Sequence, residues 1–159
     1  MSHELPIVSS RRLPFALVRS PDLISPGTKP SLMDSIVHFE IPAKDPKRAS
    51  AFYTKAFGWN VSQFPNFEYW SLVTTESEKD GRPKSPGAIN GGMGKKGEMA
   101  PNNVTVTISV PDIDAALKNI NKLGGKESGK KMPVGDMGWS AYFEDTEGNI
   151  IGLWQNKVM

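Results

Sequence analysis

The sequence of 159 residues contains no cysteine, which excludes disulfide bonds, thiolate metal sites and a cysteine nucleophile. No apolar run approaches the roughly 18 residues that a membrane-spanning helix needs. Basic residues are not gathered into one stripe, as nucleic-acid-binding proteins require, and the net charge is only +2. We therefore expect no membrane partner, no nucleic-acid partner and a cytoplasmic location.

Histidine is nearly as scarce, with two residues in the chain. No Ser–His–Asp set can be argued from them, because His3 lies in the N-terminal stretch and His38 stands alone. Residues 1–34 are rich in Pro and Ser and keep no helical or strand period. We predict an irregular N-terminal arm there. It either packs on the core or on a partner through the apolar run 13–18, or it is disordered.

From residue 35 the hydrophobic periodicity becomes readable. Residues 35–41 alternate as a half-buried strand does, and Asp45 is the expected N-cap of a helix that begins at Pro46 and ends at Gly58. Three further strands are predicted at 60–64, 67–75 and 87–94.

The same order then recurs, and an internal repeat constrains the fold more than any single element does. Residues 103–126 match the first strand and helix at a constant offset, which pairs Asp112 with Asp45. Residues 138–144 and 148–154 resemble the last two strands of the first copy. The sequence therefore predicts an α+β fold of two βαβββ modules, 35–95 and 103–156, within one domain spanning 35–156.

Three stretches of this repeat resemble the vicinal oxygen chelate superfamily: HFEIPAKDPKRASAFYTKAFGW, VTVTISVPDIDAALKNINKLGG and FEDTEGNIIGLWQ. That superfamily includes glyoxalase I, extradiol dioxygenases, methylmalonyl-CoA epimerase and bleomycin-resistance proteins. The resemblance implies two modules that form a curled mixed sheet around a cavity, with the helices on the convex side. Modules in this family pair within one chain or between two chains, and we expect a homodimer.

Most catalytic members hold a divalent metal through His or Gln on the first strand and Glu on the last strand of each module. Carried onto this sequence, these positions fall on His38, Thr105, Gly91 and Gly152. One imidazole, one hydroxyl and two glycines do not suit Zn²⁺, Ni²⁺ or Fe²⁺. The resemblance therefore predicts a degenerate metal site, with no metal and no cofactor. The two glycines either leave room for a ligand or are required by close packing.

Strand alternation predicts which side chains face the cavity. The catalytic candidates are His38 and Glu40, neighbours on one face. His38 is either a general base or a vestigial ligand, and Glu40 is either an acid–base group with a pKa raised by burial or a solvated residue at the rim. The candidate ligand-binding residues are Trp70, Asn90, Gly91, Met93, Thr105, Thr107, Tyr142, Gly152 and Trp154.

Several of these candidates have an alternative structural interpretation. Trp70 and Trp154 either stack on a flat ligand or belong to the core. Asn90 either offers its amide to a ligand or shapes a bulge. The periodicity does not fix the direction in which Tyr142 points.

The function that follows is a glyoxalase-like protein that binds a small, partly apolar organic molecule between its modules without a metal. The alternative is a metal-independent lyase or isomerase that uses His38 and Glu40. A metal-dependent lyase or dioxygenase comes third, because it would need ligands from loops or from the arm.

Overall fold

This computed structural model describes residues 33–79, 82–98 and 100–157. The predicted arm, residues 1–34, therefore lies outside the described residues except for its last two. The described part folds in the following order: β1 (Ile36–Ala43), α1 (Pro46–Phe57), β2 (Asn60–Gln63), β3 (Tyr69–Val73), β4 (Gly91–Lys95), β5 (Thr105–Ser109), α2 (Ile113–Lys122), β6 (Lys126–Glu127), β7 (Met132–Val134), β8 (Gly138–Glu144) and β9 (Ile150–Asn156).

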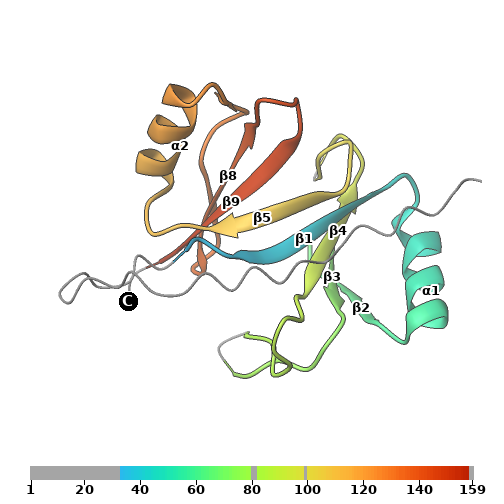
Figure 1. The fold of residues 1–159 in the computed structure, drawn as a ribbon. Helices are drawn as coiled ribbons and strands as arrows, with labels where there is room; N and C mark the ends of the chain where they lie inside the picture. Colours follow the sequence, from blue (N-terminus) through green and yellow to red (C-terminus); the bar gives the residue numbers. More distant parts are fainter. Residues whose placement is uncertain (1–32, 80–81, 99, 158–159) are drawn as a thin grey trace, which may run out of the picture. The chain divides into compact units, whose positions relative to one another are not determined.

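All the strands belong to one curled mixed sheet with the order β2-β3-β4-β1-β5-β9-β8-β6, and β7 also pairs with β8 (Figure 1). Within each module the first strand runs parallel to the last, β1 beside β4 and β5 beside β9. The two modules meet where β1 pairs antiparallel with β5. The modules therefore pair within one chain, and the predicted α+β fold with a curled mixed sheet is confirmed.

Both helices begin as the sequence predicts. The Asp45 carboxylate accepts a hydrogen bond from the backbone N–H of Arg48 at 3.0 Å, and Pro46 occupies the first helical position. The Asp112 carboxylate accepts from two N–H groups in the first turn of α2. Gly58 ends α1 with φ of 69°, a left-handed conformation that favours glycine. Local capping chemistry thus fixes where each helix starts.

The two helices differ in how deeply they pack. On α2, Ile113 is fully buried and Leu117 nearly so, in a core shared with Phe143 and Leu153 of β8 and β9. No residue of α1 is buried, and Phe52 on this helix is 58 % exposed. Figure 1 shows α2 alongside β8, whereas α1 lies at the other end of the domain beside β2. The module-two core is therefore the better closed of the two.

Some strands differ from the predicted bounds. The strand predicted at 67–75 is shorter, and the one predicted at 87–94 begins only at Gly91. Between α2 and β8 the chain also forms two short strands that the sequence analysis did not predict, β6 and β7, which pair with β8. Such short edge strands carry little periodicity, so pattern analysis misses them.

Candidate functional site

The side chains of the site project from the face of the sheet opposite α1 and α2, which we call the concave face. On β1, Phe39 and Ile41 pack into the module-one core under α1. Because successive side chains on a strand alternate, His38 and Glu40 point to the concave face. On β5 the same alternation places Thr105 and Thr107 there, since Ile108 packs with the module-two core. These positions agree with the expected orientations of β1 and β5.

Four side chains, His38, Glu40, Tyr69 and Tyr142, form a hydrogen-bonded group that we call the Glu40 cluster. The Tyr142 hydroxyl donates to Glu40 Oε2 at 2.6 Å, and the Tyr69 hydroxyl donates to Glu40 Oε1 at 3.1 Å. His38 Nε2 lies 3.1 Å from the Tyr69 oxygen. Tyr69 comes from β3 and Tyr142 from β8, so both modules contribute to the cluster.

Burial dominates the electrostatics of this cluster. Glu40 is only 6 % exposed, and desolvation raises the pKa of its carboxyl group, while the hydrogen bonds from Tyr142 and Tyr69 act in the opposite direction. Burial lowers the pKa of His38, which favours its neutral form. The pKa values of both tyrosines are raised, by burial and then by the Glu40 charge, so both phenols keep their protons.

The raised pKa of Glu40 predicts a pH-dependent stability. A carboxyl group whose pKa is higher in the folded than in the unfolded protein stabilises the fold fully only below the unfolded pKa, about 4.3. This stabilisation is lost as pH rises through the folded pKa. We therefore expect the unfolding free energy of wild type, relative to Glu40→Gln, to fall between pH 4 and pH 7. Urea unfolding of both proteins across that range measures the difference, and a wild type that gains stability relative to the variant would contradict it.

Tyr69 is the functional candidate that the sequence analysis missed. The alternation of β3 could have found it. Trp70 and Leu72 are the apolar residues that pack into the module-one core, so Tyr69 points to the opposite face. Tyr142 was selected without a direction, and the packing of Ala141 and Phe143 against α2 now sets its side chain on the concave face.

The glycine positions on β4 require a correction. Gly91 was matched with Gly152, but the register pairs Glu40 of β1 with Gly92, just as it pairs Thr107 of β5 with Gly152. Gly92 is therefore the equivalent of Gly152. A Cβ on Gly91 would instead lie 2.5 Å from the Phe39 ring, on the α1 side of the sheet. The match of Gly91 with Gly152 was therefore wrong by one residue, which reverses the face of the strand.

The interpretation of these glycines as room for a ligand is also wrong. A Cβ on Gly92 would overlap the Tyr69 phenol, and a Cβ on Gly152 would lie 2.5 Å from Thr107 Oγ1. The space beside both glycines is filled by side chains of the protein itself. Close packing therefore explains both glycines, and on β4 it is what lets Tyr69 reach Glu40.

Three predicted ligand-binding residues lie away from the concave face or already have partners. Met93, fully buried, and Trp70, 7 % exposed, pack together in the module-one core under α1, so the predicted inward direction of Met93 is wrong. The Asn90 amide accepts from the backbone of Thr74 and Thr75 and donates to Ser77 Oγ. Asn90 thus holds the loop before β4 in place.

Trp154 remains on the concave face, because its neighbour Leu153 packs into the module-two core on the other side of β9. The Trp154 indole N–H donates to Asn156 Oδ1 at 2.8 Å, and a Cβ on Gly138 would meet its ring. Trp154 therefore lies against Gly138 at the start of β8, and it is not part of the Glu40 cluster.

The donor set does not fit the family's metal site. Within residues 33–79, 82–98 and 100–157, no group of three or more His, Asp or Glu side chains could hold a metal ion. At the corresponding positions, His38 hydrogen-bonds a phenol, Thr105 donates to the Asn103 carbonyl, and two glycines face Tyr69 and Thr107.

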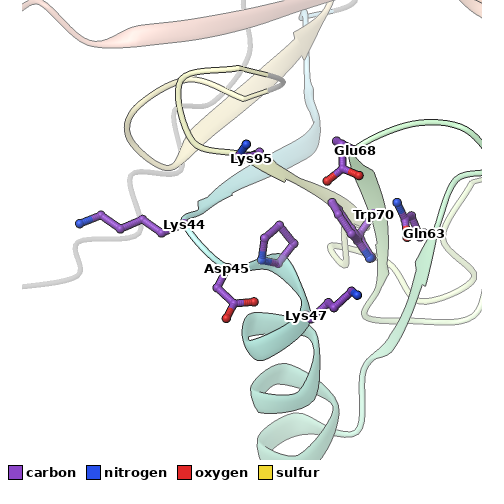
Figure 2. Close-up of a pocket in the computed structure, with 8 residues that line it drawn as sticks. Lys44, Asp45, Lys47, Gln63, Glu68, Trp70 and Lys95 are labelled. Atoms are coloured by element: carbon purple, nitrogen blue, oxygen red, sulfur yellow. The ribbon is translucent and has the colours of Figure 1, made fainter.

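Two hollows lie on the α1 side of module one, and neither is lined by a residue of the Glu40 cluster. The larger has a volume of about 500 Å³ and lies between the start of α1 and the strands β2, β3 and β4 (Figure 2). Its charges are mixed, and it is lined by Lys44, Asp45, Pro46, Lys47, Gln63, Glu68, Trp70 and Lys95. In the described part of the chain, no helix is long and apolar enough to cross a membrane.

Comparison with known proteins agrees with this fold. A family described as "Bleomycin resistance protein-like N-terminal" matches residues 35–75. A glyoxylase-like domain-containing protein from Didymella fabae is 31% identical over 122 residues, which cover 74% of this chain and 91% of that protein.

Two further comparisons extend this likeness. A putative glyoxylase, CFP32, from Mycobacterium bovis is 28% identical over 121 residues, which cover 73% of this chain and 43% of that protein. The chain thus spans less than half of that relative. The crystal structure of a glyoxalase/bleomycin resistance protein/dioxygenase superfamily member from Vibrio splendidus 12B01 has a TM-score of 0.51 at 14% identity, over 79% of this chain and 100% of the other. This likeness supports the fold alone.

Proposed function

Since the chain belongs to the glyoxalase/bleomycin resistance/dioxygenase (vicinal oxygen chelate) superfamily, we propose that it binds a small, partly apolar organic molecule on its concave face without a metal ion. The observation that carries this proposal is the Glu40 cluster. It gathers four polar side chains from both modules, yet three of the four strand positions that correspond to metal ligands in most catalytic members of the superfamily hold glycine or threonine, with His38 as the fourth. Clusters of buried titratable side chains with perturbed pKa values concentrate at functional sites, which supports a binding site here.

Binding can be located with tryptophan side chains as reporters. Trp154 lies on the concave face, whereas Trp70 and Trp59 pack in the module-one core. We expect small aromatic fragments to shift the indole N–H signal of Trp154 and the amide signals of Thr107 and Gly152 in ¹H–¹⁵N spectra of the full chain. Shifts confined to Trp59 and Trp70 would place the site on the α1 side and contradict the proposal.

Independence from metal is tested on protein purified without an affinity tag. Elemental analysis should find far less than one transition-metal ion per chain, and chelator treatment should leave fragment binding unchanged. Stoichiometric zinc, nickel or iron that is lost in a His38→Ala variant would contradict this part of the proposal.

A metal-independent lyase or isomerase is the second candidate, because burial raises the pKa of Glu40 toward the range of a general base. His38, joined to Glu40 through the Tyr69 hydroxyl, would be the partner acid or base. Hydrogen–deuterium exchange at the carbon next to the carbonyl of acetophenone, followed by NMR, separates the two candidates. Exchange that disappears in Glu40→Gln while binding persists favours the enzyme, and binding without exchange favours the binding protein.

The assignment of residues 35–156 to the family domain and of residues 1–34 to an arm is part of this proposal. The homodimer and the cytoplasmic location stay predictions. The exposed aromatic side chains Phe52 and Phe57 on α1 offer an apolar surface for a contact between two copies.

A further inference from the structure

The hydrogen bonds of the Glu40 cluster all run in one direction. Each tyrosine has one hydroxyl proton, and both protons are donated to the Glu40 carboxylate. The Tyr69 oxygen can then only accept from His38, so the hydrogen-bond pattern assigns the imidazole proton to Nε2. His38 Nδ1 is left as a lone-pair acceptor.

Every remaining hydrogen-bonding position in the cluster is consequently an acceptor. Lone pairs remain on both phenol oxygens, on the Glu40 carboxylate and on His38 Nδ1. Thr105, on the neighbouring strand, already donates its hydroxyl proton to the Asn103 carbonyl. A molecule that forms hydrogen bonds to these four side chains must therefore supply the donors.

The charge of the cluster also favours a ligand that donates hydrogen bonds. Among the described residues, no lysine or arginine forms an ion pair with Glu40. Its carboxylate is buried, and it is stabilised by hydrogen bonds from the two phenols. A buried carboxylate without a cation is costly, and an opposite charge supplied by a ligand would offset part of that cost. The net charge of the chain is +2, so any preference for a cation would come from this site and not from the overall charge.

From this polarity we propose that the concave-face ligand is an organic cation, an amine whose ammonium group donates to the oxygens of Tyr69, Tyr142 and Glu40. This inference rests on the proposed concave-face binding site and names the chemical class of its ligand. The preference is opposite to that of a metal site, which stabilises an anionic substrate.

Three probes of similar size and different charge test the inference: benzylamine, benzyl alcohol and benzoate. Titrated into the full chain at neutral pH and followed through the Thr107, Gly152 and Trp154 signals, benzylamine should bind at least about tenfold more tightly than benzoate, a difference of about 1.4 kcal/mol. Benzyl alcohol should fall between them. Glu40→Gln should weaken benzylamine binding about tenfold and leave benzyl alcohol nearly unchanged.

Matched controls keep the outcomes distinct. Glu147→Gln makes the same change in net charge at an exposed turn and should leave all three affinities unchanged. Tyr142→Phe, which keeps the carboxylate, should weaken benzylamine less than Glu40→Gln does, and it serves if that variant fails to fold. Benzoate binding as tightly as benzylamine on the concave face would overturn the inference and leave the site standing. No concave-face shift with any probe would overturn both.

Discussion

Replacing Gly92 by alanine is expected to destabilise the protein by about 1–3 kcal/mol and to remove fragment binding at the Glu40 cluster. The new methyl group would overlap the Tyr69 phenol, which lies across β4 to reach Glu40. Tyr69 would have to leave this position, and Glu40 and His38 would both lose its hydroxyl group. Urea unfolding measures the stability, and the Trp154 and Thr107 NMR signals report the binding.

The control for this prediction is the same substitution in a Tyr69→Ala background. If the phenol is the group that Gly92 accommodates, the alanine costs much less there, and the double-mutant cycle gives a large coupling energy. Equal costs in the two backgrounds would show that Gly92 serves the β4 backbone instead.

Replacing Ile113 by alanine is expected to cost about 2–5 kcal/mol, the range for a large aliphatic side chain removed from a packed core. Ile113 is fully buried where α2 meets β8 and β9. The matched change on the other helix, Phe52→Ala, should cost less than about 1 kcal/mol, because Phe52 is 58 % exposed. Thermal or urea unfolding of the two variants makes the comparison.

A large loss of unfolding free energy in Phe52→Ala would also be informative. It would mean that the exposed aromatic face of α1 is covered in the full protein by something beyond residues 33–79, 82–98 and 100–157. A second copy would make that cost depend on protein concentration, whereas the protein's own N-terminal residues would not.

Much of the fold could be predicted because the signals were local and repeated. Asp45 and Asp112 cap their helices as expected, since an aspartate before a helix satisfies backbone N–H groups wherever it occurs. The alternation on β1 placed His38 and Glu40 on one face without any knowledge of the sheet. The partners of Glu40 could not be predicted, because Tyr69 and Tyr142 reach it from distant strands.

The prediction of which face each β4 side chain points to was wrong for a different reason. Its segment, GGMGK, contains three glycines and one apolar side chain, so it carries almost no period of two. Without that period only the alignment of the two copies set the register, and a slip of one residue placed Met93 on the wrong face. The cross-strand partners Glu40 and Gly92 settle the register, and these pairs exist only once the sheet is formed.

The antiparallel seam between β1 and β5 makes each half of the molecule dependent on the other. A fragment ending before β5 would expose the hydrogen-bonding groups of β1 along an open edge, which invites self-association. It would also carry Glu40 with Tyr69 but without Tyr142. Fragments cut in the 101–104 connection should regain the cluster only when mixed, so complementation of the two halves would report whether the seam has reformed.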